Sequence, residues 1–324
     1  MRGAFLDALF EAAASDRRVC LVVGDLGYSV VERFAAAFPN QFINAGVAEQ
    51  NMTGLAAGMA LTGKIVFTYS IANFSTFRAL EQIRNDLCYQ RANVKVVSVG
   101  GGLAYGSLGM THHATEDLAI MRSLPEMTVV APGDPVEAKL ATRAVIKHDG
   151  PCYLRLGKVG EPSVHAADPD FRLGRAIRVR EGSDVTMIST GAMLNTAVAA
   201  ADRLSDRGLS VDVLSMHTVS PLDVEVVTAA AMQTKYIVTL EEHSIVGGLG
   251  GAVAELLSEL PAGRAQLKRI GLRHEFNRVV GDQAYLRALH GLDLDTVVTT
   301  IDDLVEASGH SLTRAATNAD LDAK

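Results

Sequence analysis

One acidic side chain, Glu49, stands between a short hydrophobic segment and a helix rich in glycine and alanine, in the stretch Asn44-Ala-Gly-Val-Ala-Glu-Gln-Asn-Met-Thr-Gly54. A carboxylate in the first turn of a helix is stabilised by the helix dipole, which alone would account for its position. A carboxyl group in a dry pocket lined by aromatic rings has a raised pKa, however, and can share a proton with a ligand. Glu49 is therefore the first candidate for proton chemistry.

Aromatic rings and histidines elsewhere in the sequence could complete such a site. Phe74 and Phe77, in Ser70-Ile-Ala-Asn-Phe-Ser-Thr-Phe77, could offer a face on which a planar ring stacks, or could be core residues. His112 and His113 end a glycine-punctuated loop, and a histidine can donate hydrogen bonds or move protons near neutral pH. Two adjacent histidines without further ligands are poor evidence for a metal, so we expect no metal ligands in this chain.

Three polar residues follow the ends of expected strands, which is where α/β folds place ligands. Asp25 and Ser29 come after the strand Val19–Val23, although turns use both residue types for structural reasons. Arg155 comes after the hydrophobic run that begins at Cys152, and its planar fork of N–H donors suits a phosphate oxyanion. The alternative for Arg155 is an ion pair.

Strands that alternate with helices indicate a parallel sheet covered on both faces. A polar stretch with Pro162 and Pro169 interrupts the alternation and indicates a linker. We therefore expect two doubly wound α/β domains, at residues 1–160 and 184–310, with a linker at 161–183 and a frayed tail at 311–324. The second sheet should be mostly parallel.

The hydrophobic periodicity predicts the individual elements. Expected helices are residues 3–14, Glu32–Phe38, the helix after Glu49, Phe77–Gln90, Glu116–Met121, Pro135–Ile146, Leu194–Arg207, Pro221–Met232 and Ala252–Leu260. Expected strands are Val19–Val23, Phe42–Asn44, Lys64–Tyr69, Val94–Val99, Thr128–Ala131, Cys152–Leu156, Val185–Ser189, Ser210–Ser215, Tyr236–Glu241 and Lys268–Leu272.

Composition excludes several classes of protein. The 324 residues, 48% of them hydrophobic and 21% charged, suit two globular domains and argue against disorder. A net charge of −7 gives no basic footprint for nucleic acid. The three cysteines have no pairing or ligand spacing, which suits a reducing compartment, and no apolar run reaches the length of a membrane span. We expect a soluble, cytoplasmic protein.

The sequence around Glu49 resembles the pyrimidine-binding domain of the transketolase family, and the similarity continues in the same order through nearly the whole chain. The segments that carry it are Gly46-Val-Ala-Glu-Gln-Asn-Met-Thr53, Arg84-Asn85, Thr111-His112, Glu116-Asp117, Arg122-Ser-Leu-Pro-Glu-Met127, Val129-Val-Ala-Pro-Gly-Asp-Pro135, Ser189-Thr-Gly191, Ser220-Pro-Leu-Asp223 and Glu241-Glu-His243 with Gly247-Gly-Leu-Gly250. The resemblance implies a pyrimidine-binding domain followed by a transketolase C-terminal domain that packs subunits together.

The resemblance also implies thiamine diphosphate as the cofactor and a role for Glu49. In that family the glutamate hydrogen-bonds N1′ of the aminopyrimidine, and the cofactor's exocyclic nitrogen then removes the proton from C2 of the thiazolium. Phe74 matches the family's stacking phenylalanine, whereas Phe77 fits a core residue better. The cofactor stabilises the carbanion that no side chain could.

The substrate residues follow from the same resemblance. His112 matches the histidine that reaches the C1 hydroxyl and carbonyl of the donor sugar, with His113 beside it. Ser29, near Asp25, falls at the acceptor-phosphate position, and Arg155 matches an arginine that contacts a sugar phosphate.

Two positions depart from the family pattern. Gly100 stands where a histidine lines the phosphate channel, and Leu108 stands where an aspartate reads a sugar hydroxyl. Apolar or absent side chains cannot pair with those groups, so discrimination among pentose and hexose phosphates should be weaker. The donor and acceptor, and whether they carry phosphate, therefore stay open.

A domain for the cofactor's diphosphate is missing from the pattern. That domain should carry Gly-Asp-Gly and a later asparagine, because Mg²⁺ needs hard oxygen ligands. Gly24-Asp25-Leu26 and Gly281-Asp282-Gln283 lack the third glycine and the asparagine. We expect an α-type partner subunit to hold the diphosphate and most of the Mg²⁺ coordination, in an α₂β₂ assembly that alone is active.

The leading hypothesis is thus the β-type subunit of a transketolase that transfers a two-carbon ketol unit from a ketose or ketose phosphate to an aldose-type acceptor. A 1-deoxyxylulose-5-phosphate synthase-like enzyme, or another thiamine enzyme that uses an α-keto acid, is the first alternative. The β subunit of a ketoacid dehydrogenase fits less well, because its loop differs from Thr111-His-His113. A non-catalytic partner subunit is the last alternative, and Glu49 with Phe74 argues against it.

Overall fold

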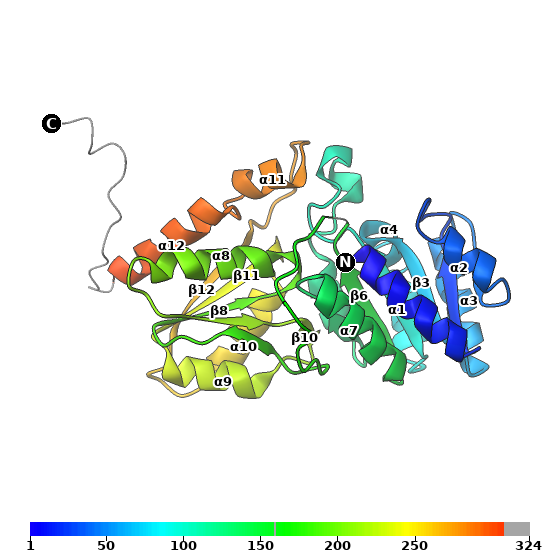
Figure 1. Cartoon of the computed structure of the whole chain (residues 1–324), viewed down its shortest axis with the longest axis horizontal. Coiled ribbons are helices and arrows are strands. Elements are labelled where there is room, and N and C mark those ends of the chain that lie inside the picture. The colour runs from blue at the N-terminus through cyan, green and yellow to red at the C-terminus, as the bar shows by residue number, and fades with distance from the viewer. Residues whose placement is uncertain (159, 308–324) are drawn as a thin grey trace.

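The structure is a computed structural model that describes residues 1–158 and 160–307, in two α/β lobes that lie side by side (Figure 1). The tail expected at 311–324 lies outside the described residues. Within these ranges, no helix combines the length and the apolar composition that crossing a bilayer requires. The fold class predicted from the sequence, two doubly wound α/β domains, is confirmed.

The first lobe contains a seven-stranded sheet. Its strands are β1 (Val19–Val23), β2 (Phe42–Asn44), β3 (Ile65–Ile71), β4 (Val94–Val99), β5 (Thr128–Val130), β6 (Cys152–Leu156) and β10 (Thr218–Ser220). They lie in the order β10-β5-β6-β4-β3-β1-β2, and only β10 runs antiparallel to its neighbour. Helices cover both faces, so β1, β4 and β6 are buried along their whole length and consist mainly of apolar residues.

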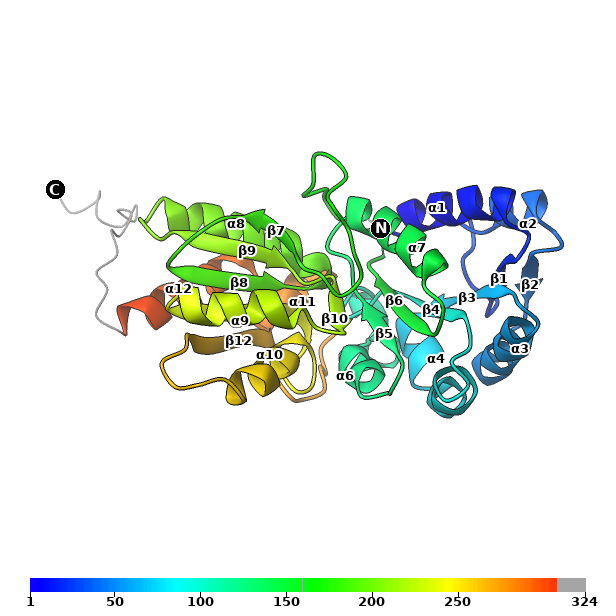
Figure 2. The same ribbon diagram turned by 90° about the horizontal axis from the view of Figure 1, so that it is seen from below.

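Helices cover the two faces of this sheet in distinct groups (Figure 2). One face carries α1 (Arg2–Ser15), α2 (Glu32–Ala37) and α7 (Pro135–Lys147). The other carries α3 (Glu49–Leu61), α4 (Ala72–Thr76), α5 (Leu80–Gln82), the π-helical turn Ile83–Cys88 and α6 (Asp117–Arg122). The face with α3 and α4 is the one that positions Glu49 and Phe74.

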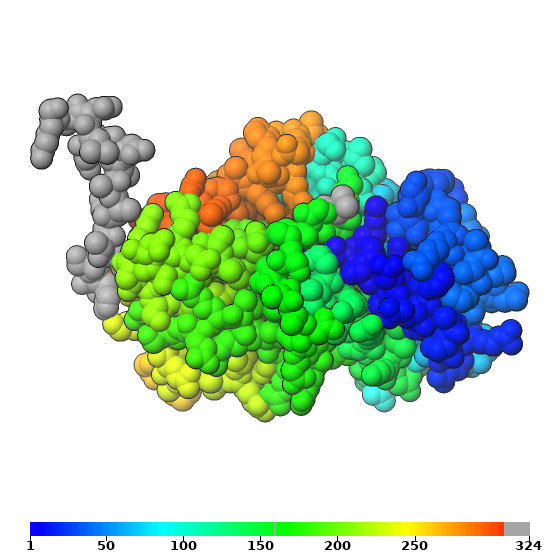
Figure 3. Space-filling model, viewed as in Figure 1, coloured from blue at the N-terminus to red at the C-terminus, as the bar shows by residue number. Residues whose placement is uncertain are grey.

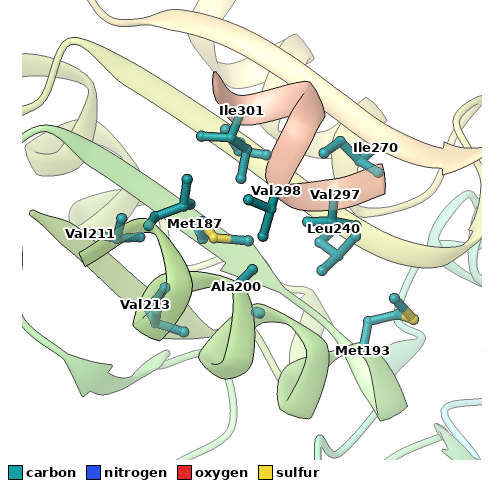
Figure 4. Packing of buried hydrophobic residues seen from close by; sticks show 14 of the residues in the cluster. Met187, Met193, Ala200, Val211, Val213, Leu240, Ile270, Val297, Val298 and Ile301 are labelled. Atoms are coloured by element: carbon teal, nitrogen blue, oxygen red, sulfur yellow. The ribbon is translucent and has the colours of Figure 1, made fainter. Parts of the chain in front are cut away.

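The second lobe is a five-stranded sheet with helices on both faces. Its strands are β7 (Ile177–Arg180), β8 (Val185–Ser189), β9 (Val211–Ser215), β11 (Tyr236–Ser244) and β12 (Gln266–Leu272), in the order β12-β11-β8-β9-β7 with only β7 antiparallel. The helices are α8 (Leu194–Ser205), α9 (Val224–Gln233), α10 (Leu249–Ser258), α11 (Gln283–Leu289) and α12 (Leu294–Glu306). Val297, Val298 and Ile301 of α12 pack with Met187 and Leu240 in the core that Figure 4 shows.

Several elements differ from the sequence prediction. The single helix expected at Phe77–Gln90 is wrong, because α5 and the π-helical turn take its place. Strand β7 lies inside the expected linker, and its alternating exposure on a sheet edge gives a weaker hydrophobic signal than a buried strand. Helices α11 and α12 were not predicted, although Asp282 and Asp293 each cap a helix by accepting a backbone N–H bond.

A buried polar cluster joins the lobes. The Arg155 guanidinium donates to the Asp117 carboxylate at 2.7 and 3.1 Å and to the carbonyl of Glu242 at 3.1 Å. Tyr153 also donates to Asp117, at 2.6 Å. Burial lowers the pKa of His243 to about 4, so its neutral Nε2 accepts the Ala119 N–H at 3.2 Å. Together with β10, these contacts tie the second lobe to the first.

Asp117→Asn tests how much this cluster contributes to the free energy of unfolding. The substitution leaves the Arg155 cation buried without its counter-charge, so the free energy of unfolding should fall by roughly 3–5 kcal/mol, measured by urea denaturation. Asp16→Asn is the matched control, because Asp16 pairs with Arg18 on the surface and its loss should cost less than about 1 kcal/mol. Equal small losses for the two variants would contradict the assignment.

Candidate active site

Glu49 is the first residue of α3 and its side chain is 0% exposed. Its Oε2 accepts a hydrogen bond from Nη1 of Arg78 at 2.6 Å. Its Oε1 is buried and has no hydrogen-bond partner within the described residues. Gly24, at the carboxyl end of β1, lies beside it: a Cβ added at Gly24 would stand 3.7 Å from that Oε1. One oxygen of the carboxyl group, Oε1, is thus available to bond a ligand.

Phe74 comes from the short helix α4, which directly follows β3. Its ring lies edge-to-face with that of His112, with centroids 5.2 Å apart. The Arg78 guanidinium carbon lies 4.8 Å from the centroid of Phe74. The structure thus brings Glu49, Phe74 and His112 to one place. Phe77 instead borders a hollow with Asn73, Met110 and His113.

His112 lies on a loop that turns at Gly109, where φ is +78°. Thr111 Oγ1 is 3.1 Å from His112 Nδ1, which fixes the orientation of the ring. His113 is only 4% exposed, its Nε2 has no partner among the described residues, and burial lowers its pKa. His113 is therefore a neutral buried group, whereas His112 contacts the Phe74 ring.

Asp25 and Ser29 lie in the loop after β1, both with positive φ. The Asp25 carboxylate accepts a hydrogen bond from the Asn44 amide at 2.9 Å, which stabilises the turn. Ser29 borders a hollow of about 410 Å³ together with Arg2, Arg33 and Lys158. Asp7 also lines this hollow and pairs with Arg33 at 3.4 Å, so Arg2 and Lys158 are the cations that suit an anionic ligand there.

Lys158 and Arg2 were not identified from the sequence. Lys158 follows the carboxyl end of β6, and its Nζ lies 4.8 Å from the centroid of the Tyr105 ring. A cation directly beyond a parallel strand was the signal that could have pointed to Lys158. Arg2 begins α1 and carries no such signal.

The substrate role expected for Arg155 needs a correction. Its side chain lies within β6 and its guanidinium already pairs with Asp117, Ala114 O and Glu242 O in the buried junction. Binding a phosphate there would require breaking a buried ion pair. We therefore assign Arg155 to joining the lobes.

Tyr105 connects the residues near Glu49 with Lys158 at the hollow beside Ser29. A Cβ added at Gly100 would stand 2.1 Å from the Tyr105 ring, so this ring takes the space that a side chain at Gly100 would fill. The Tyr105 and His112 centroids are 6.3 Å apart. Contacts therefore form one continuous row, in the order Glu49, Arg78, Phe74, His112, Tyr105 and Lys158.

The first end of this row fits the aminopyrimidine of thiamine diphosphate. An unpartnered buried Oε1 on Glu49 can bond a ring nitrogen, and the Phe74 ring can stack on a planar heterocycle.

Glu241, Glu242 and His243 form no anion site: Glu241 accepts the backbone N–H groups of Leu249 and Gly250, and burial raises its pKa to about 7.

Comparison with known families matches both lobes. Residues 1–159 match the model of the transketolase pyrimidine-binding domain, and residues 174–297 match that of the transketolase C-terminal domain. The chain is 39% identical to the 6-deoxy-6-sulfo-D-fructose transketolase subunit SqwH of Clostridium sp. (strain MSTE9), over 94% of each chain. It is 38% identical to a subunit of the apulose-4-phosphate transketolase of Phocaeicola vulgatus, over 94% of this chain and 97% of that one.

A solved structure is similar over almost the same range. It is described as a split-gene transketolase in an inactive β4 tetramer, with 37% identity and a TM-score of 0.85. The match covers 94% of this chain and 97% of that one. The similarity thus extends over both lobes rather than over one motif.

Proposed function

The chain belongs to the transketolase family, and on that premise we propose that it is the β-type subunit of a two-subunit transketolase that uses thiamine diphosphate. The reaction is transfer of a two-carbon ketol unit from a ketose or ketose phosphate to an aldose-type acceptor. The observation that carries the proposal is the buried Glu49 with its free Oε1, whose partner Arg78 lies over the ring of Phe74.

Three residues of the row, Glu49, Phe74 and His112, have distinct parts in the proposed reaction. When bound, thiamine diphosphate supplies the carbon nucleophile and the electron sink that side chains lack. Glu49 holds a proton at Oε1 against the ring nitrogen of the cofactor, in a pocket that excludes water. Phe74 fixes the plane of that ring. His112, which contacts Phe74, donates a hydrogen bond to the oxygens at the reacting end of the donor sugar.

The other end of the row suits an anionic substrate terminus. Lys158, Arg2 and Ser29 surround the 410 Å³ hollow, and Lys158 is linked to His112 through Tyr105. The substrates for which two relatives are named carry a sulfo group and a phosphate, respectively. We assign the hollow to such an oxyanion, with Asp25 shaping the loop that presents Ser29.

The diphosphate and Mg²⁺ would be held mainly by an α-type subunit, in an α₂β₂ assembly. Val47, just before α3, and Leu61, the last residue of α3, are 71% and 70% exposed. Gly54 and Gly58 of α3 have no atom within 4 Å of an added Cβ, so a second helix can approach closely there. This exposed apolar surface adjoins the site that lacks a diphosphate-binding half, which supports the α-type subunit as its occupant.

The cytoplasm is the compartment that we propose for this complex. Cys20, Cys88 and Cys152 are buried free thiols, which suits a reducing environment.

Glu49→Gln in the co-expressed complex tests the proposal. Glutamine keeps the shape but cannot hold the proton, so ketose-plus-aldose turnover should fall by about 10²- to 10⁴-fold. Glu81→Gln, which changes an exposed carboxylate on α5, is the matched control and should leave turnover unchanged. Unchanged turnover in Glu49→Gln would refute the catalytic assignment. Turnover of pyruvate plus aldehyde instead of ketose plus aldose would favour the α-keto-acid alternative.

Lys158→Met tests the anionic terminus. Loss of the ammonium should raise KM for a phosphorylated donor by about 10-fold, since a hydrogen bond to a charged group contributes roughly 1.5–3 kcal/mol. KM for the corresponding uncharged sugar should not change. Lys139→Met removes a lysine that pairs with Asp168 outside the site and serves as control. An equal change for both sugars would contradict the assignment of the hollow.

A further inference from the structure

Arg78 contacts both groups that we propose for the cofactor's ring: it pairs with Oε2 of Glu49, which leaves Oε1 free, and it lies over the ring of Phe74. Its Nη1 donates to Oε2 of Glu49 at 2.6 Å, and its guanidinium carbon lies 4.8 Å from the Phe74 centroid. The guanidinium is planar and delocalised and carries N–H donors on its edge. A flat donor group therefore occupies the space between the carboxyl group and the aromatic ring.

The aminopyrimidine would bond Oε1 of Glu49 and stack on Phe74, and the guanidinium covers the Phe74 face on which the ring would stack. While the guanidinium lies there, the cofactor's ring cannot stack on Phe74. This arrangement of Arg78 thus suits the chain without cofactor, and Arg78 must move before the cofactor's ring can bind.

Burial explains why Glu49 needs such a partner before the cofactor binds. The Glu49 side chain is 0% exposed, and an unpaired buried carboxylate is strongly unfavourable. Arg78 is 46% exposed, so it can leave towards solvent without a large rearrangement of the fold. The mobile member of the pair is therefore the arginine.

We infer that Arg78 is a positioning residue that covers the Phe74 face in the free chain and moves away from it when the aminopyrimidine binds. Until then it pairs with Oε2 of Glu49 and covers the Phe74 ring. The inference rests on the cofactor assignment proposed above. Because Arg78 competes with the cofactor, removing it should strengthen binding, a gain that general structural damage would not produce.

Arg78→Met in the co-expressed complex tests the inference. Methionine preserves the apolar stem and removes the guanidinium, so the Kd for thiamine diphosphate with Mg²⁺, measured by calorimetry, should fall about 10-fold. Arg78→Lys keeps the charge without the planar fork and should give a Kd between those of the parent and Arg78→Met. Arg84→Met is the control, because Arg84 is an exposed arginine that bonds its neighbour Asn85, and its loss should not change Kd.

The free chain gives a second readout that does not depend on activity. Arg78→Met should lower its Tm, because Glu49 loses its cation, and the second substitution Glu49→Gln should restore it. A Kd that is unchanged or weaker in Arg78→Met, with the parent complex binding normally, would overturn the inference alone. If the parent complex bound no thiamine diphosphate, the proposed function would fail and the inference with it.

Discussion

The site depends on one electrostatic constraint: the Glu49 carboxyl group is buried at the start of α3 and a single ion pair compensates it. Helix α3 places it there because the chain turns from β2 directly into the helix, beside Gly24 at the end of β1. An oxygen without a partner among the described residues remains inside this pocket. A buried polar atom that no protein group satisfies is costly, and a ligand that bonds it removes that cost.

The second lobe contributes to the site through the loop that carries His112. Glu242 accepts the Leu103 N–H at 2.6 Å, and a Cβ added at Gly106 would stand 2.6 Å from the Gly281 carbonyl. The space-filling view shows the segment of α11, in orange, against this loop (Figure 3). Arg155, which pairs with Asp117, also donates to the Ala114 carbonyl at the end of the same loop. The C-terminal lobe thus helps to position the loop of His112, the residue that we propose for substrate binding.

Much of the fold could be predicted from the sequence because buried parallel strands are continuous apolar runs, as in Val19–Val23. Edge strand β7 gave a weaker signal because its residues alternate in exposure. Helix α12 was missed although Val297, Val298, Ile301 and Val305 follow helical spacing after the cap at Asp293. The meeting of Glu49, Phe74 and His112 followed from the family motifs. The different surroundings of Arg155 and Lys158 could not be predicted, because both are cations near the end of β6. Only the structure shows that Arg155 pairs with Asp117, whereas Lys158 lies over the Tyr105 ring.

The central claim is that this chain holds one half of a cofactor site. It is tested most directly by titrating thiamine diphosphate and Mg²⁺ into the isolated chain and into the chain co-expressed with an α-type subunit, with binding followed by calorimetry. We expect the isolated chain to bind at least about 100-fold more weakly than the complex, a difference of roughly 2.7 kcal/mol. Equally tight binding by the isolated chain, accompanied by full turnover, would contradict the claim.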